Sequence, residues 1–315
     1  EVLEGEAALE MVASHSDVHA VMAAIVGAAG LRPAMAAAKA GKRLMLANKE
    51  ALVVGGQLFM DAVADGGATL LPIDSEHSAI FQCLPEDPAV WPQRVDHIIL
   101  TASGGPFRTR EPSSLRDVTP QQAGNHPNFA MGRKISIDSA TMMNKALEVI
   151  EARWLFNLQP EQIQVVIHPQ QIVHSMVQFR DASVLAQLGT PDMRVPIACG
   201  LAWPERVASG AAPLDFAKLS ALTFEEADAR RFPGLHLSWQ ALRAAEGTTT
   251  VLNAANEVAV AAFLDGRMRF DQIYQINAQA LDGVLPQAPG SIDALLALDA
   301  EVRCYAEARI AELAV

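Results

Sequence analysis

Cysteine is scarce in this sequence. The three cysteines, Cys83, Cys199 and Cys304, are scattered, odd in number and without CxxC spacing. This argues against a disulfide framework, and we expect reduced thiols in an intracellular protein.

Positive charge and long apolar runs are also lacking. Lys and Arg number 24 against 36 Asp and Glu, a net charge of -12, which argues against nucleic acid as the partner. A small phosphate ligand remains compatible, because a few local cations suffice for it. No apolar run reaches ~18 residues, and no basic-then-apolar signal segment opens the chain. We therefore expect no membrane partner and a cytoplasmic location.

The glycine-rich G-x-G-x-x-G turn of dinucleotide-binding folds is absent as well. Glu1 begins directly in a helical pattern, without a leading strand. We expect a chain cut from a longer protein that would carry the first nucleotide-binding turn.

Hydrophobic residues are plentiful, at 50% of a 315-residue chain with only 19% charged residues. This composition predicts a large core and about two domains. In the first part, apolar runs at 18–26, 44–47 and 69–73 alternate with helical patterns at 5–15, 32–40 and 48–67. Such alternation predicts βαβ units with a parallel sheet, whose ligands bind beyond the carboxyl ends of the strands.

The remaining chain shows other patterns. A strand is expected at 97–101, and short β-rich runs at 165–168, 172–179 and 183–188 predict antiparallel additions to a mixed sheet. Residues 201–224 have little periodicity and suggest a linker. Helical patterns at 248–264 and 270–281, and a last helix capped by Ser291, predict a closing helical bundle.

The stretch 126–156 gathers polar groups beside an apolar stripe. We expect a strand at Ile135–Ile137, an N-cap at Ser139 that favours anions, and then a long helix. On that helix Glu148 shares a face with Asn144 and Lys145. The alternative is a solvated surface Lys–Glu pair of little energetic value.

Three carboxylates suggest a metal site. Asp74 and Glu76 follow a strand, and alternation would put both on one side. With Glu148, and without Cys or paired His, they suit Mg²⁺ or Mn²⁺. Ordinary acidic loop residues are the alternative.

Other loops offer further groups. Ser103-Gly104-Gly105 after a strand could hold an oxyanion or be a plain glycine turn. His126–Gly132 has the composition of a lid, or of a surface loop. His168 and His174 could ligate a metal, but structural histidines fit better because no ligand spacing is met.

Seven segments together resemble 1-deoxy-D-xylulose 5-phosphate reductoisomerases, in order along essentially the whole chain. They are ANKEALV (47–53), PIDSEH (72–77), TASGGPFR (101–108), HPNFAMGRKISIDSATMMNK (126–145), EARWLF (151–156), LGTPDMR (188–194) and LNAANEVAV (252–260).

The resemblance implies an NADPH-dependent and metal-dependent homodimeric enzyme of non-mevalonate isoprenoid synthesis. It converts 1-deoxy-D-xylulose 5-phosphate, a sugar phosphate, to 2-C-methyl-D-erythritol 4-phosphate by skeletal rearrangement and then hydride transfer to an aldehyde. Mg²⁺ or Mn²⁺ serves, and Co²⁺ also does. Bacterial members lack a targeting peptide, whereas plastid members carry one.

The resemblance also implies site residues. The metal ligands would be Asp74, Glu76 and Glu148, the last also near substrate. The phosphate would be held by Ser103, Ser139, Asn144 and Lys145. The substrate oxygens would be contacted by Lys49, Ser75, Glu76 and His126, of which Lys49, Glu76 and His126 would be catalytic. The cofactor would be touched by Asn48, Glu50 and Gly132.

The implied fold class is α/β, divided into four parts along the chain. These are a partial Rossmann-like NADPH-binding domain with a parallel sheet (1–73), a central α/β catalytic domain with a mixed sheet and lid (74–208), a linker (209–228) and a C-terminal α-helical bundle (229–315). Two departures stand out: the glycine-rich nucleotide loop is absent, and Phe129 replaces the tryptophan of many members.

Two other functions fit the same residues. A metal-dependent phosphatase or phosphosugar isomerase would turn over a sugar phosphate without nucleotide. A non-catalytic binding fragment would bind metal and sugar phosphate but transfer no hydride.

Overall fold

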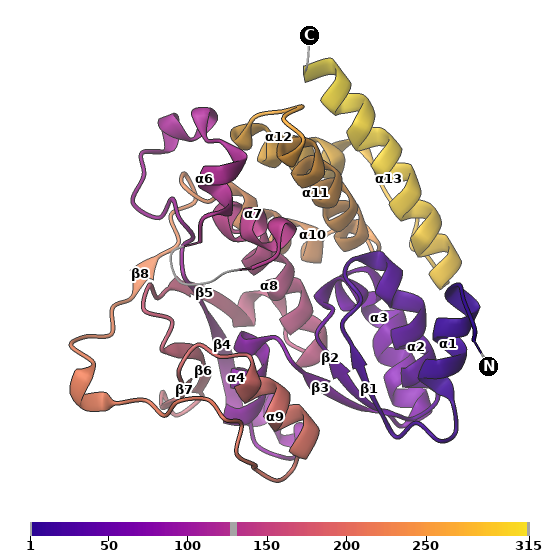
Figure 1. Cartoon of the computed structure of the whole chain (residues 1–315), viewed down its shortest axis with the longest axis vertical. Helices are drawn as coiled ribbons and strands as arrows, with labels where there is room; N and C mark the ends of the chain where they lie inside the picture. Colours follow the sequence, from indigo (N-terminus) through magenta and orange to yellow (C-terminus); the bar gives the residue numbers. More distant parts are fainter. Residues whose placement is uncertain (1, 127–130, 314–315) are drawn as a thin grey trace. The chain divides into compact units, whose positions relative to one another are not determined.

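A computed structural model of the chain describes residues 2–126 and 131–313. It contains two compact units. Unit 1 comprises Glu1–Thr101 and Ala152–Glu225, and unit 2 comprises Ala102–Glu151 and Glu226–Val315. The chain passes between them within β4 (Val95–Ala102), α8 (Met143–Leu155) and β8 (Glu225–Glu226), which are labelled in Figure 1.

The first sheet of unit 1 is parallel, with strand order β1-β2-β3. Its strands are β1 (Ala20–Ala23), β2 (Arg43–Leu46) and β3 (Thr69–Pro72), and its helices are α1 (Glu6–Ser14), α2 (Leu31–Lys39) and α3 (Lys49–Gly66). Strand β2 lies in the centre of this sheet, and its last three residues, Leu44–Leu46, are apolar and buried. Strands covered on both faces are typically apolar in this way. The predicted strand–helix alternation is confirmed, although β1 is shorter than the apolar run 18–26.

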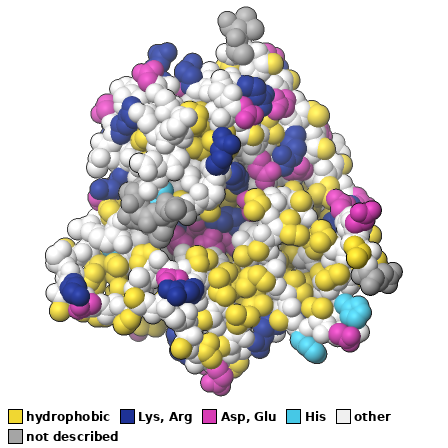
Figure 2. Space-filling view, viewed as in Figure 1, with side chains coloured by type: hydrophobic (Ala, Val, Ile, Leu, Met, Phe, Trp, Pro, Cys, Tyr) yellow, Lys and Arg dark blue, Asp and Glu magenta, His cyan; other side chains and the backbone are white. Residues whose placement is uncertain are grey.

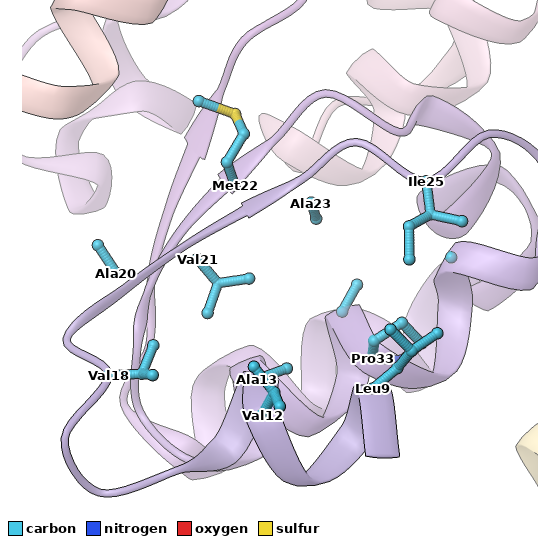
Figure 3. A pocket seen from close by; sticks show the side chains of 12 residues that line it. Leu9, Val12, Ala13, Val18, Ala20, Val21, Met22, Ala23, Ile25 and Pro33 are labelled. Carbon is cyan, nitrogen blue, oxygen red and sulfur yellow. The ribbon is translucent and has the colours of Figure 1, made fainter. Parts of the chain in front are cut away.

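An apolar hollow lies between α1, β1 and α2 (Figure 3). Only hydrophobic side chains and Gly30 line it, among them Leu9, Val21 and Pro33. Figure 2 shows hydrophobic side chains gathered over the same sheet. The residues that line this hollow offer no charged group to a sugar phosphate.

The second sheet has the order β7-β6-β4-β5-β8. Strand β6 (Val173–Phe179) pairs antiparallel with both β4 and β7 (Val184–Leu188), and β5 is Ile163–Ile167. Helix α4 (Ser75–Cys83) packs against β6 and β7, and α9 (Arg194–Ala202) packs against α4. The predicted antiparallel additions are confirmed for β6 and β7.

Unit 2 is built around α11 (Thr248–Leu264), which is buried along nearly all of its length. It packs against α7 (Arg133–Thr141), α10 (Pro233–Arg243), α12 (Phe270–Gly283) and α13 (Ile292–Leu313). The Ser291 hydroxyl accepts a hydrogen bond from the Ala294 amide, as predicted for the cap of α13. The closing helical bundle and the α/β fold class are confirmed, whereas the four-part domain division stays a prediction.

Short helices connect these elements. They are α5 (Trp91–Arg94), α6 (Pro120–Gly124) and the 3-10 turns Ala28–Gly30, Pro88–Val90, Pro112–Asp117, Pro160–Gln162 and Phe216–Lys218. Over residues 2–126 and 131–313, no helix combines the length and apolar character needed to cross a membrane.

The strand predicted at Ile135–Ile137 is wrong, because this segment is part of α7. Ile137 and Ala140 lie in a core cluster with Ala259 and Phe263 of α11, and this packing decides in favour of a helix. Ser139 consequently lies inside α7 and is not an N-cap. Met142, in a left-handed conformation, ends α7, and α8 begins at Met143.

Candidate functional site

The predicted site residues of unit 1 form a cluster at the carboxyl ends of β2 and β3, here called the strand-end cluster. It consists of Asn48, Lys49, Glu50, Asp74, Ser75 and Glu76. Lys49 Nζ lies 2.6 Å from Asp74 Oδ2, with side chains 9% and 14% exposed. A shielded ammonium thus sits against a predicted metal ligand, and it favours the ionised carboxylate.

Glu76 lies on a helix and not on the extended segment that the alternation argument assumed. Asp74 occupies the N-cap position of α4, and Ser75 and Glu76 belong to its first turn, so the alternation argument for Asp74 and Glu76 is wrong. The Ser75 hydroxyl donates a hydrogen bond to Glu76 Oε2 at 2.6 Å. A carboxylate in the first turn is favoured by the helix dipole.

Asn48 is the N-cap of α3 and ties this helix to the loop that follows β1. Its Oδ1 accepts a hydrogen bond from the Ala51 amide at 2.6 Å, and its Nδ2 donates to the Gly27 carbonyl at 3.0 Å. These bonds fix the turn that presents Lys49, with the buried Glu50 following it.

The predicted site residues of unit 2 form a second group, here called the helix cluster. It consists of Ser103 and His126, which contact each other, Ser139 next to the Ser103 loop, and Asn144, Lys145 and Glu148, which are joined on α8. Lys145 and Glu148 are buried, at 3% and 1% exposed, and the Lys145 ammonium donates to Glu148. Asn144 Nδ2 donates to the other oxygen of Glu148 at 2.5 Å. The alternative of a solvated surface pair is therefore wrong.

Ser103 and His126 meet within the helix cluster. Ser103 Oγ lies 3.0 Å from His126 Nε2 and accepts a hydrogen bond from the Gly105 amide. Burial lowers the pKa of the His126 imidazole. Gly105 has φ of 64°, and a side chain there would meet the Ser139 carbonyl at 2.6 Å. Only glycine lets this loop lie so close to α7.

The predicted lid lies partly outside the described residues, since these exclude 127–130 and with them Phe129. Gly132, its last residue, occupies the N-cap position of α7.

His168 has the structural role that we preferred for it. Its Nε2 accepts hydrogen bonds from the Ile172 and Val173 amides, and its Nδ1 lies 2.8 Å from the Thr223 carbonyl. This pattern requires a neutral ring that donates at Nδ1, and both ring nitrogens are engaged with backbone.

The chain matches three family models along its length. Residues 1–56 match 1-deoxy-D-xylulose 5-phosphate reductoisomerase, 70–156 match the 1-deoxy-D-xylulose 5-phosphate reductoisomerase C-terminal domain, and 188–305 match the DXP reductoisomerase C-terminal domain. The reductoisomerase of Cupriavidus pinatubonensis is 61% identical over 308 residues, which cover 98% of this chain and 78% of that protein.

The chain belongs to the 1-deoxy-D-xylulose 5-phosphate reductoisomerase family. The reductoisomerase of Tolumonas auensis is 56% identical over 322 residues, covering 81% of that protein. This membership favours a reductoisomerase over the metal-dependent phosphatase or phosphosugar isomerase.

Solved structures of the family share the fold. A reductoisomerase in complex with NADPH, fosmidomycin and magnesium has a TM-score of 0.96 and 47% identity, with 99% of this chain and 80% of that chain covered. The Zymomonas mobilis reductoisomerase in complex with NADPH has a TM-score of 0.91 and 48% identity, with 97% and 78% covered.

Sequence reasoning missed one polar network next to the helix cluster. Asp138 of α7 is bound by Lys134 of the same helix and by Asn256 of α11, and Asn256 is bound by Asn277 of α12. The signal was present in the segment LNAANEVAV, whose Asn253 and Asn256 place two amides in a mostly apolar helix.

Proposed function

We propose that this chain catalyses the NADPH-dependent and metal-dependent conversion of 1-deoxy-D-xylulose 5-phosphate to 2-C-methyl-D-erythritol 4-phosphate. The observation that carries the proposal is the 61% identity to a reductoisomerase over 98% of the chain. The substrate would first isomerise to a branched aldehyde of the same composition. The aldehyde carbon would then receive a hydride from NADPH, and its oxygen would receive a proton.

The proposed metal ligands are Asp74 and Glu76 of the strand-end cluster and Glu148 of the helix cluster. Carboxylate oxygens are the donors that Mg²⁺ and Mn²⁺ prefer, and Co²⁺ accepts them too. The donor set fits: Lys49 pairs with Asp74 and Lys145 with Glu148, which favours the ionised carboxylates that a metal needs. When bound, the metal would polarise the substrate carbonyl as a Lewis acid.

The proposed phosphate site lies in the helix cluster. Ser103 and Ser139 supply hydroxyls, Asn144 an amide and Lys145 a buried ammonium. Because the Lys145 side chain is only 4% exposed, its attraction for a phosphate is weakly screened by water. Phosphate bound by these groups would anchor one end of the substrate, and the other end would then be oriented toward the metal ligands.

The remaining assignments concern the reacting end of the substrate. Lys49 would stabilise negative charge on a substrate oxygen, and Ser75 would hold a hydroxyl. Glu76 would accept and return a hydroxyl proton, as a general base and acid. Buried His126, whose lowered pKa keeps it neutral at neutral pH, would donate or accept one hydrogen bond beside Ser103.

The cofactor contacts are assigned to Asn48, Glu50 and Gly132. Asn48 and Glu50 lie at the start of α3, beyond a strand of the parallel sheet, where nucleotides bind in such folds. Gly132 precedes the N-terminus of α7. NADPH bound there would supply the hydride.

The experiment that tests the function follows both substrates of the reaction. NADPH oxidation is recorded with 1-deoxy-D-xylulose 5-phosphate and Mn²⁺, and the product is identified by mass spectrometry. We expect equal amounts of NADP⁺ and 2-C-methyl-D-erythritol 4-phosphate. Release of inorganic phosphate, or conversion of substrate without NADPH oxidation, would contradict the proposal.

We also propose that the chain forms a homodimer through β7, one of the two edge strands of the second sheet. Its Val184 and Leu185 are about half exposed despite being apolar, and an unpaired edge favours association with a second copy. Val184→Lys should shift the sedimentation coefficient from dimer to monomer. An unchanged dimer would exclude β7 as the interface. The four-part domain division and a cytoplasmic location remain predictions.

A further inference from the structure

Unit 2 contains a buried carboxylate that the proposed mechanism does not use. Asp138 of α7 is 1% exposed. Its Oδ2 lies 2.9 Å from Lys134 Nζ, one turn earlier on the same helix, and its Oδ1 accepts a hydrogen bond from Asn256 Nδ2 at 2.8 Å. Asn256 lies on α11 and is fully buried. One carboxylate thus joins two helices.

The direction of this network follows from the carboxylate. An ionised carboxylate can only accept hydrogen bonds, so Asn256 must turn its Nδ2 toward Asp138. The Oδ1 of Asn256 is then free to accept, and it does so from Asn277 Nδ2 of α12 at 3.0 Å. Asp138 therefore determines the orientation of two buried amides on two further helices.

The residue that follows Asp138 on α7, Ser139, lies close to the loop that carries Ser103 and Gly105. Gly105 lies so close to α7 that a side chain on it would meet the Ser139 carbonyl at 2.6 Å. The loop residue Ser103 and the helix residue Ser139 are both proposed phosphate contacts. A shift of α7 along α11 would move Ser139 directly, and would move Asn144 and Lys145 through the short junction at Met142.

We propose that Asp138 is a positioning residue for the phosphate end of the substrate. By holding α7 on α11 through Asn256, it places Ser139, and with it Asn144 and Lys145, at the distances that phosphate requires. The inference rests on the proposed function and assigns to its phosphate site a support in the helical bundle.

Three variants test this role as a double-mutant cycle. Asp138→Asn keeps the size of the side chain and removes its charge. Asn256→Asp places two carboxylates face to face. The double variant Asp138→Asn/Asn256→Asp restores a donor–acceptor pair, since a carboxylate at 256 can accept from an amide at 138 and from Asn277.

Inorganic phosphate and 1-deoxy-D-xylulose 5-phosphate are the probes, with dissociation constants from calorimetry. We expect each single variant to bind both probes about tenfold more weakly, because losing one hydrogen bond to a charged group has an effect of this size. The double variant should return to within about threefold of the original protein, as expected when one coupled contact is restored. Binding of phosphate-free 1-deoxy-D-xylulose and of Mn²⁺ alone should not change.

The control is a similar ionic network in the same bundle but not on α7. Arg303 of α13 pairs with Asp299 of α13 and Glu257 of α11. Asp299→Asn should lower the thermal midpoint without changing the phosphate dissociation constant. A purely structural role for Asp138 would make its variants behave like this control.

Each outcome has a definite meaning. The positioning role is overturned if Asp138→Asn and Asn256→Asp bind phosphate as tightly as the original protein does. It is also overturned if Asp299→Asn weakens phosphate binding as much as they do. If Asn256→Asp does not fold, Asp138→Asn alone carries the comparison with the control. If Ser139→Ala and Lys145→Ala also bind phosphate normally, the proposed phosphate site is wrong and the positioning role fails with it. If those two variants bind weakly while Asp138→Asn binds normally, only the positioning role fails.

Discussion

Lys49 and Asp74 form an ion pair of 2.6 Å in which both side chains are mostly shielded from solvent. The pair joins the first residue of α3 to the residue that precedes α4. It holds a cation beside a carboxylate that we propose as a metal ligand. The positive charge of Lys49 would therefore repel a divalent cation bound to Asp74.

The first prediction concerns this repulsion. Lys49→Met removes the positive charge but keeps much of the side-chain volume. Affinity for Mn²⁺ alone should rise by about tenfold, because one nearby like charge is lost, while turnover should fall. Calorimetry with Mn²⁺ and steady-state kinetics measure the two effects. Mn²⁺ affinity that is unchanged or lower would contradict the predicted repulsion between Lys49 and a metal bound to Asp74.

The second prediction concerns Glu148. Glu148→Gln preserves the shape of the side chain and removes its charge, and it should weaken Mn²⁺ binding by at least ~100-fold. The effect should be this large because substituting even a residue that only orients a metal ligand lowers metal affinity about 10–100-fold. Glu257→Gln is the matched control, because Glu257 also bears a basic partner but lies outside the helix cluster. Equal Mn²⁺ affinity in the original protein and Glu148→Gln would reject the assignment.

The third prediction separates phosphate binding from other contacts. Lys145→Ala should weaken binding of 1-deoxy-D-xylulose 5-phosphate by about 100-fold, the scale of a buried charge pair. Binding of 1-deoxy-D-xylulose, which lacks the phosphate, should not change. Lys218→Ala serves as control, because that side chain is 84% exposed. A parallel loss for both ligands would mean that Lys145 acts on the metal site through Glu148.

The fourth prediction is a pH dependence of stability. Burial lowers the pKa of His126 in the folded protein, whereas in the unfolded chain it titrates near ~6.5. Between these two values the unfolded state binds more protons, so the free energy of unfolding falls as pH falls through this window. Above the unfolded value this contribution is constant.

The thermal midpoint of the original protein and of His126→Gln, measured from about pH 8 to about pH 5, tests this sign. Glutamine can still hydrogen-bond to Ser103 but does not titrate. The loss on acidification should be smaller in the variant. Curves that run parallel over the whole range would show that His126 does not contribute.

The fifth prediction concerns thiol reactivity. Burial raises the pKa of the Cys83 thiol to about 11, and it also raises that of Cys199, whereas Cys304 is exposed. Since the thiolate is the nucleophile, Cys304 should react with a maleimide at neutral pH at least ~100-fold faster than Cys83. Cys304→Ser should remove the fast phase. Rapid labelling of Cys83 in the folded protein would contradict this.

Much of the fold was predictable because local patterns and tertiary packing agree there. The strand–helix alternation up to β3, the antiparallel strands and the Ser291 cap follow from periodicity and turn residues alone. The segment at 135–137 was misjudged because its alternating pattern is too short to distinguish strand from helix. Contacts with α11, more than a hundred residues away, decide its conformation.

The candidate site was predictable at the level of residue type. The family motifs indicated the candidate residues, whose roles stay predictions, and burial then showed that Lys145 and Glu148 do not form a surface pair. The link from Asp138 to Asn256 was not predictable from spacing, because 118 positions separate the two residues. Only the packing of α7 on α11 brings them together.

The most direct test of the account is NADPH oxidation with 1-deoxy-D-xylulose 5-phosphate, measured with Mn²⁺, with excess chelator, and in Glu148→Gln. The account predicts metal-dependent oxidation that forms 2-C-methyl-D-erythritol 4-phosphate and is abolished by the chelator and by the substitution. Full activity in the presence of the chelator, or an unchanged rate in Glu148→Gln, would contradict it.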